Sequence, residues 1–297
     1  MPKLSIIVPT KNEPTARKSI LMLRKAFGSN TEIIVVDKSN AAYRKKLLDT
    51  DAIILKQETD GYENALMEGF QKASGDVIST LDPDGTYSIN DFKNVVAEIS
   101  KGKADFVCGN RLDHPAAGAM TLSISLGNRF LTGLFNILYR KKIHDALSGS
   151  FAMTKKAFDS IREEEPYRAG TMFFEIELAR RGYRIAEVPI SYVPRKGSTS
   201  RITRAKPIYG LNIASHSIRY ARDYNPLIIF GGFGLILGFI GFVLGLAVVA
   251  SYMHTGALTE PGRALIAFML IVLGFLSIIS GLILDLLLQI EKKLYRK

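Results

Sequence analysis

The sequence predicts an α/β domain with a mainly parallel sheet, followed by two membrane-spanning helices. Short apolar runs alternate with amphipathic patterns through residues 1–110, a rhythm typical of a parallel sheet covered by helices on both faces. Two long apolar stretches follow near the C-terminus. A single cysteine, Cys108, and four histidines in 297 residues argue against a disulfide scaffold and a Cys/His zinc site.

Five apolar runs, most of them rich in β-branched residues, are typical of strands. They occupy residues 4–9, 32–37, 52–56, 76–82 and 105–109, and helical patterns fall near 15–26, 41–50, 62–73 and 89–101. Ligands of such sheets bind at the carboxyl ends of the strands. The polar segments that follow the runs are therefore the first candidates for a site, and they lie at 9–13, 37–39, 82–85 and 109–111.

Two further helices are expected outside this alternation. Residues 118–142 form a strongly apolar pattern that ends in basic residues, and it suits either a core helix or a helix at the membrane surface. Residues 203–222 are basic and directly precede the first long apolar stretch, which favours an interfacial helix. We expect both to belong to a catalytic domain of residues 1–225.

The C-terminal part, residues 226–297, is predicted to be a transmembrane hairpin with a basic tail. The spans are expected near 227–251 and 264–288, and the segments 227–251 and 264–284 contain no charged side chain. At about 1.5 Å per residue each can cross a hydrocarbon core of about 30 Å. Two buried helices of a soluble core are the alternative.

Charge predicts the orientation of this hairpin. Basic residues precede the first span and follow the second, whereas the connecting loop contains only Arg263. The positive-inside tendency then places both termini in the cytoplasm. The N-terminus also lacks the features of a signal peptide, so we expect residues 1–225 to stay on the cytoplasmic side of the cell membrane.

The net charge is +11, and the excess of basic residues is concentrated between residues 180 and 222, next to the first span. Anionic lipid headgroups attract each basic residue there by about 1 kcal/mol. Nucleic acid is a less suitable partner because no aromatic side chains are interleaved with this basic segment.

The segment Asp82-Pro83-Asp84 follows a predicted strand, so both carboxylates are expected at its end. Two carboxylates on a tight turn suit Mg²⁺ or Mn²⁺, although such a segment is also a common turn and helix cap. Glu13 and Asp37, at two further strand ends, could accept hydrogen bonds from a nucleoside. The absence of a Walker lysine motif and of a Gly-x-Gly-x-x-Gly segment disfavours nucleotide triphosphate hydrolysis and dinucleotide binding.

Several segments together resemble a known enzyme family. They are PTKNE, VVDKS, GYENALMEGFQKASGD, LDPDG, GNR, DALSGSFAM and GYRIAEVPISYVPRKGSTSRI, in this order and followed by two spans. They resemble the family 2 glycosyltransferases of GT-A fold, in particular the dolichol-phosphate mannose synthase and polyprenyl-phosphate glycosyltransferase group. The resemblance covers essentially residues 3–225.

The resemblance implies a reaction and its partners. A monosaccharide, most simply mannose or glucose, would pass from a nucleotide-sugar such as GDP-mannose to a membrane polyprenyl (dolichyl) phosphate, with inversion and with Mg²⁺ or Mn²⁺. A phosphate monoester is already anionic at neutral pH, so no histidine or serine triad is required. An oligomer is possible, because a glycine stripe in the first span could pack against the second span or against another copy.

The resemblance also assigns roles to residues. The nucleotide-sugar would be bound by a set drawn from several motifs, namely Pro9, Lys11, Glu13, Val35, Asp37, Asp82, Pro83, Asp84, Arg111, Arg195 and Arg201. The metal would be held by Asp82, Asp84 and Thr86. Asp84, Arg111 and Arg195 would act in the transfer itself, and the acceptor phosphate would meet Arg111, Arg129 and Ser148.

The chain departs from the family pattern at three positions. Val36 replaces the first aspartate of the usual pair, Thr86 stands where Gln or Ser is usual, and Ser125 stands where relatives often have an arginine. Arg129 could substitute for that arginine.

The sequence alone also allows two other functions. A transferase acting on a neutral membrane lipid would need a general base, for which Glu175 or Glu177 is the candidate. A non-catalytic nucleotide-sugar sensor is a second alternative. Processive polysaccharide synthesis is disfavoured because the chain has two predicted spans and no tryptophan.

Overall fold

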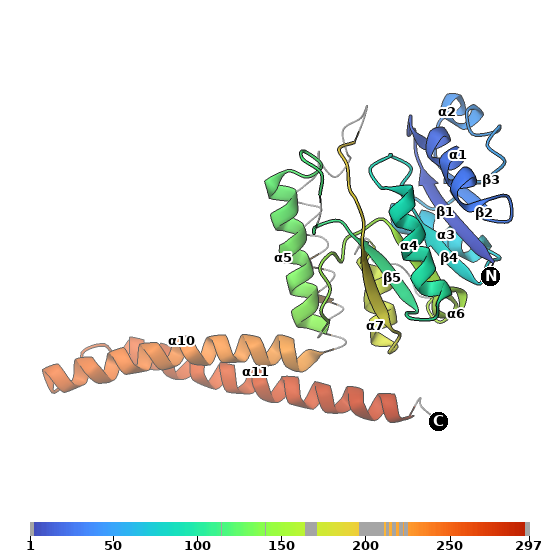
Figure 1. The fold of residues 1–297 in the computed structure, drawn as a ribbon. Coiled ribbons are helices and arrows are strands. Elements are labelled where there is room, and N and C mark those ends of the chain that lie inside the picture. Colours follow the sequence, from blue (N-terminus) through green and yellow to red (C-terminus); the bar gives the residue numbers. More distant parts are fainter. Residues whose placement is uncertain are drawn as a thin grey trace. The chain divides into compact units, whose positions relative to one another are not determined.

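The computed structural model describes residues 3–113, 115–139, 141–163, 171–195 and 225–294, with six isolated positions between 211 and 222. The chain divides into two compact units, Met1–His216 and Ser217–Lys297. Figure 1 shows the α/β arrangement of the first unit and the long helix pair of the second. The predicted helix at 203–222 lies largely outside the described residues, and Arg201 lies wholly outside them.

Within the described residues, the first unit contains a seven-stranded sheet in the order β3-β2-β1-β4-β6-β5-β7 (Figure 1). β6 runs antiparallel to its neighbours β4 and β5, and the other pairs are parallel. The strands are β1 (Leu4–Thr10), β2 (Glu32–Asp37), β3 (Ile53–Lys56), β4 (Val77–Thr80), β5 (Phe106–Asn110), β6 (Phe151–Thr154) and β7 (Ile185–Pro189). The predicted α/β class with a mainly parallel sheet is confirmed.

The five predicted strands are present as β1 to β5, whereas β6 and β7 were not predicted. β7 is an edge strand that contains Glu187 and Pro189, so it lacks the continuous apolar run that marks a central parallel strand. β6 pairs antiparallel with β4 and β5, outside the alternation of strands and helices from which β1 to β5 were predicted.

Five helices fall close to their predicted positions. They are α1 (Ala16–Phe27), α2 (Ala41–Lys45), α3 (Tyr62–Lys72), α4 (Ile89–Ser100) and α5 (Leu122–Tyr139). The further helices α6 (Lys155–Asp159) and α7 (Met172–Arg180) had no predicted bounds. The pattern at 41–50 gives only the short α2, which begins at the cap residue Asn40. Its side chain accepts a hydrogen bond from the backbone N–H of Tyr43.

Alternation along β1 explains how the sheet is covered on both faces. Ile6 and Val8 belong to the buried cluster that includes Ile20 of α1 and Phe92 of α4. Ile7 points to the other face, toward α3. A Cβ atom on Gly69 would lie 2.6 Å from Cγ2 of Ile7, so α3 approaches the sheet closely at this glycine.

Helix α5 packs with one face only. Leu131, Phe135 and Leu138 are buried, whereas the other face exposes four apolar side chains at mostly four-residue spacing. These are Leu122, Leu126, Phe130 and Ile137, exposed by 75%, 57%, 69% and 66%. The helix thus contributes to the core and also presents an uncovered apolar stripe within the first unit.

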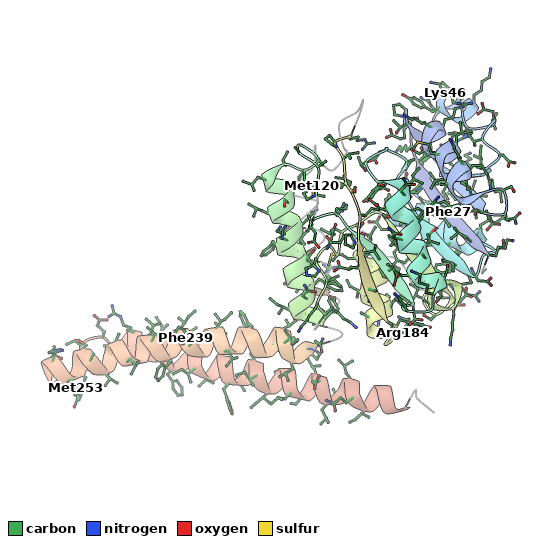
Figure 2. The ribbon with its side chains drawn as sticks, viewed as in Figure 1. Phe27, Lys46, Met120, Arg184, Phe239 and Met253 are labelled. Carbon is green, nitrogen blue, oxygen red and sulfur yellow. The ribbon has the colours of Figure 1, made fainter. Side chains whose placement is uncertain are left out.

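The second unit is a hairpin of α10 (Pro226–Thr255) and α11 (Pro261–Leu294). Both helices are long and apolar enough to cross a membrane. Gly234 faces the backbone of Gly274 closely, and Ser277 Oγ donates to the Phe230 carbonyl oxygen at 2.7 Å. Figure 2 shows side chains projecting outward along both helices, with Phe239 and Met253 of α10 labelled. This structure fits the predicted transmembrane hairpin, and packing within the hairpin accounts for part of the glycine stripe.

Candidate active site

The order of the strands places the candidate site at the boundary between β1 and β4. From β1 the chain continues outward to β2 and β3, and from β4 it continues to the other half of the sheet. In open α/β sheets, ligands bind outside the carboxyl ends of the strands at such a point. Glu13 follows β1 there, and Asp82 and Asp84 follow β4.

The turn that carries the two aspartates is tied down by the residues before and within α1. Thr15 Oγ1 lies 2.7 Å from the Pro83 carbonyl oxygen, and Ser19 Oγ donates to the same oxygen at 2.9 Å. Thr15 also donates to Oε1 of Glu13. The ends of β1 and β4 are therefore held together.

Thr86 positions Asp84. Its backbone N–H and its hydroxyl both donate to Oδ1 of Asp84, at 3.1 and 2.6 Å. Thr86 is 2% exposed, so its hydroxyl is engaged in this contact. In this arrangement its contribution to a metal site would be indirect, through the orientation of the Asp84 carboxylate.

Asp82 is enclosed from two sides. Tyr62 of α3 donates from its hydroxyl to Oδ1 at 2.7 Å, and the backbone of Gly149 lies so close to Oδ2 that any Cβ atom there would clash. Burial, with the neighbouring Asp84 charge, raises the pKa of Asp82 to about 7. The close approach of Gly149 to Asp82 was not predicted, although Gly149 belongs to DALSGSFAM, one of the segments that resemble the family.

Arg195 contacts carboxylates that follow two different strands, β1 and β4. Its Nη2 pairs with Oε2 of Glu13, and its Nη1 lies 3.7 Å from Oδ2 of Asp84. Its Nε is buried without a hydrogen-bond partner among the described residues. The guanidinium thus neutralises two carboxylates at the place where an anionic ligand with a cation would bind.

Arg111 is held in a buried ion pair. Asp145, which is 0% exposed, accepts from Nε and Nη2 of Arg111 at 2.7 and 2.8 Å. The Arg111 guanidinium also lies over the Tyr192 ring, 5.5 Å from its centroid, and Glu187 accepts from the backbone N–H of Asp145 at 2.9 Å. Asp145 fixes this arginine and was not singled out from the sequence.

The residues expected to meet the acceptor lie on the β5 and β6 side of the sheet. Arg129 of α5 donates from Nη2 to the Leu112 carbonyl oxygen at 3.2 Å. Ser148 is 1% exposed, and its hydroxyl lies 3.4 Å from the Ser150 carbonyl oxygen. Within the described residues, Arg129 is therefore on the surface and Ser148 is within the loop that encloses Asp82.

The remaining expected nucleotide ligands lie at the ends of β1 and β2. Pro9 and Val35 are buried in these strands and Lys11 is exposed just beyond β1. Asp37 is 0% exposed. Its Oδ1 accepts from Ser39 N–H at 2.9 Å, and its Oδ2 accepts from Arg44 Nε at 2.6 Å.

Neither glutamate of α7 is arranged as a general base. Glu175 is 2% exposed, and burial raises the pKa of its carboxyl well above the ordinary value. Glu177 is 2% exposed and pairs with Arg180 and Arg181. Both carboxylates are therefore enclosed within the domain, and neither is exposed to an alcohol acceptor.

Asp82 and Asp84 are hard oxygen donors of the kind that Mg²⁺ and Mn²⁺ prefer. Among the described residues, no group of three acidic, histidine or cysteine side chains converges to hold a metal ion. Two carboxylates are nevertheless sufficient for a cation whose remaining ligands are phosphate oxygens and water. The residues present thus fit a cation that arrives with a phosphorylated ligand.

The mainly parallel α/β sheet and the charged side chains at the β1–β4 boundary define the class of this domain, and comparison with known proteins identifies the family. Residues 5–162 match glycosyl transferase family 2. The chain belongs to this family and is a glycosyltransferase.

Two curated proteins of Haloferax volcanii are similar to this chain. Glycosyltransferase AglJ is 27% identical over 292 residues, which span 97% of this chain and 94% of that protein. A dolichyl-phosphate hexose transferase is 28% identical over 197 residues, which span 66% of this chain and 85% of that protein.

Solved structures share the fold. Glucosyl-3-phosphoglycerate synthase from Mycobacterium tuberculosis, determined with Mn²⁺, uridine diphosphate and glucosyl-3-phosphoglycerate, matches with a TM-score of 0.56 at 18% identity, over 74% of this chain and 80% of that one. Mannosyl-3-phosphoglycerate synthase from Rubrobacter xylanophilus matches with a TM-score of 0.54 at 17% identity, over 73% and 74%. The expected GT-A fold is confirmed.

Proposed function

We propose that this enzyme transfers a hexose from a nucleotide-sugar to the phosphate of a membrane polyprenol, such as dolichyl phosphate, with inversion at the sugar. The observation that carries the proposal is the meeting of Glu13, Asp82, Asp84 and Arg195 at the β1–β4 boundary, in a family 2 chain that also has two helices suited to spanning a membrane. The similarity to a dolichyl-phosphate hexose transferase supports the acceptor.

The chemistry follows from an acceptor that is already charged. A phosphate monoester with a second pKa of about 6 is an anionic nucleophile at neutral pH. One of its oxygens forms a bond to C1 of the sugar, and the bond from C1 to the donor diphosphate oxygen breaks, with its electron pair leaving on the nucleoside diphosphate. No protein base is required for this step.

The residues of this chain would position the reactants and stabilise the leaving group. Arg195 can move from Glu13 and Asp84 to the donor diphosphate, for which its planar fork is well suited. A divalent cation at Asp82 and Asp84 would neutralise charge on the diphosphate. Arg111, oriented by Asp145, would lie on the acceptor side.

The membrane surface would supply the acceptor. We infer that the exposed stripe of α5 lies in the acyl boundary of the bilayer, as amphipathic interfacial helices do. We further infer that residues 1–225 form the catalytic domain, that Arg201 and the basic segment 203–222 lie next to the headgroups, and that both termini are cytoplasmic.

A neutral lipid acceptor is less well supported, because it would need a base. Glu175 is buried, which raises the pKa of its carboxyl, and Glu177 is paired with two arginines. A non-catalytic sensor would bind the donor without turnover on any polyprenyl phosphate.

The test combines purified full-length protein with Mg²⁺ or Mn²⁺, a short polyprenyl phosphate and labelled nucleotide-sugars, including GDP-mannose and UDP-glucose. Label extracted into organic solvent is the expected result. Asp84→Asn should lower transfer by about a hundredfold or more while the melting temperature is retained, and the exposed Asp49→Asn is the matched control. Full activity of the Asp84 variant would contradict its role.

A further inference from the structure

The irregular segment 143–146 lies between α5 and β6 and contains Asp145, the partner of Arg111. Ile143, Asp145 and Ala146 of this segment are buried. A buried backbone N–H outside regular structure needs a hydrogen-bond acceptor from elsewhere in the protein. In this segment four consecutive backbone N–H groups, from residue 143 to residue 146, all donate to side chains.

Glu187 of the edge strand β7 accepts from two of the four groups. Its carboxylate lies 2.7 Å from the backbone nitrogen of His144 and 2.9 Å from that of Asp145. The Glu187 side chain is 11% exposed and also lies 2.9 Å from Nδ1 of the exposed His144 ring. Hydrogen bonds to an ionised acceptor are about twice as strong as those between neutral groups. Glu187 therefore fixes the backbone at the residue that holds Arg111.

Helix α5 supplies the acceptors for the other two groups. The side-chain oxygen of Asn136 accepts from the Ile143 N–H at 3.1 Å, and its side-chain nitrogen donates to the Ile143 carbonyl oxygen at 2.8 Å. Oγ1 of Thr132 accepts from the Ala146 N–H at 3.2 Å. The segment is thus fixed at both ends by α5 and in the middle by β7.

Asp145 connects this segment to Arg111. Its Oδ2 accepts from the backbone N–H and from Nε of Arg111, at 3.0 and 2.7 Å, and its Oδ1 accepts from Nη2 at 2.8 Å. Three hydrogen bonds to one carboxylate set the orientation of the guanidinium. The position of the guanidinium therefore follows the position of the 143–146 backbone.

Fixing Arg111 in advance matters for a reaction between two phosphorylated reactants. A side chain that is ordered before the ligand arrives loses less conformational freedom on binding. A misplacement of about 1 Å in an active site can lower the rate by about a hundredfold. The side chains that hold the segment are therefore expected to affect the acceptor step without touching a reactant.

We propose that Glu187 and Asn136 are positioning residues for the acceptor side of the site. They hold the segment 143–146, and through Asp145 they set the Arg111 guanidinium where it meets the acceptor phosphate. This inference rests on the proposed function, because it presupposes that Arg111 meets that phosphate.

The test is steady-state kinetics of the full-length protein in detergent, with a short polyprenyl phosphate and whichever of GDP-mannose and UDP-glucose labels it. Glu187→Ala should raise the KM for the polyprenyl phosphate by about tenfold and change the KM for the nucleotide-sugar by less than about twofold, because two hydrogen bonds from the segment to an ionised acceptor are lost. Glu187→Gln keeps an oxygen that can accept from both N–H groups, so its acceptor KM should stay within about threefold of the wild-type value.

Asn136→Ala should raise the acceptor KM in the same selective way, since the Ile143 backbone loses both of its hydrogen bonds to this side chain. It provides the same comparison if Glu187→Ala does not yield folded protein. An unchanged acceptor KM in folded variants at both positions would overturn the inference.

A double-mutant cycle tests the connection to Arg111. If Glu187 acts through this arginine, Glu187→Ala should change the acceptor KM of Arg111→Gln by less than about twofold, because the effects of residues in one network are not additive. The full effect of Glu187→Ala in the Arg111→Gln background would contradict the proposed connection.

Asp105→Ala is the matched control. Asp105 and Arg184 directly precede β5 and β7, and Asp105 accepts from the Arg184 backbone N–H at 3.0 Å. This variant should lower the melting temperature, as Glu187→Ala does, without raising the acceptor KM.

An equal rise of both KM values in Glu187→Ala, or the same acceptor defect in Asp105→Ala, would indicate a general role in stability and overturn the inference, while the proposed function would stand. A wild-type protein that transfers no sugar to polyprenyl phosphate would remove the proposed function and this inference with it.

Discussion

Arg195 neutralises two carboxylates that belong to different strand ends. Glu13 and Asp84 both lie next to its guanidinium, so a divalent cation that approaches Asp84 without nucleotide meets a positive charge. A nucleoside diphosphate offers Arg195 an alternative partner. The charges therefore favour joint binding of cation and nucleotide over binding of the cation alone.

The first residue-scale prediction concerns Arg195→Gln. This variant should bind Mn²⁺ alone more tightly than the wild type, because Asp84 loses its positive neighbour, and should bind the nucleoside diphosphate about tenfold or more weakly. Manganese binding is measured by electron paramagnetic resonance and nucleotide binding by calorimetry. A structural role alone would lower both affinities, and that result would contradict this account.

The second prediction concerns Glu175. Because burial raises its pKa above the ordinary 4.5, the folded protein keeps a proton that the unfolded chain loses as the pH rises past that value. Stability should therefore fall with rising pH until the folded-state pKa is passed, by at most about 1.4 kcal/mol per pH unit. Melting temperatures of Glu175→Gln between pH 5 and 8 should fall less steeply than those of the wild type. The exposed Glu58→Gln should keep the wild-type slope.

Individual site residues also show which parts of the site could be predicted from the sequence and which could not. The aspartates of the 82–84 segment were identified because they follow a strand, and the structure places both at the β1–β4 boundary. Asp145 and Gly149 were not identified, because a carboxylate that orients Arg111 and a glycine that admits Asp82 act through contacts between distant segments. No spacing within the chain reveals such contacts.

At the scale of elements, α5 combines a buried face with an exposed apolar face. One face buries Phe135 and Leu138 and the other exposes Leu126 and Phe130. The sequence pattern is apolar on both faces, so it could not separate the core face from the exposed one. The packing of α5 against the rest of the first unit determines which face is buried.

The element-scale prediction follows from this exposed stripe. The double variant Leu126→Glu/Phe130→Glu should lower transfer to a long polyprenyl phosphate in vesicles by about tenfold or more, because burying each apolar side chain contributes about 1.5–3 kcal/mol. Transfer to a short acceptor in detergent should change little. The comparison of the two acceptors is the measurement.

Leu48→Glu provides the control, because Leu48 is 71% exposed and lies between α2 and β3. It should leave both activities unchanged. An equal loss of the double variant toward both acceptors would assign α5 a role in the fold rather than at the membrane.

At the scale of the whole molecule, charge around the hairpin predicts the orientation in the membrane. A cysteine introduced by Thr259→Cys, in the loop between α10 and α11, should react with an impermeant thiol reagent in intact cells. A cysteine introduced by Ser29→Cys in the first unit should react only after permeabilisation. The native Cys108 is 1% exposed and should give little background, and the reverse labelling pattern would overturn the orientation.

The class of the protein could be predicted from sequence, because strand and helix periodicity, charge-free spans and the order of motifs are properties that can be read along a chain. The same patterns predicted β1 to β5, both long C-terminal helices and the aspartates after β4. The pairing of the charged groups depended on the folded structure. The fold enclosed Asp37 with the nearby Arg44. It also held Arg111 on Asp145 and set Arg195 between Glu13 and Asp84, because ion pairs between residues far apart in sequence depend on how the strands are ordered in the sheet.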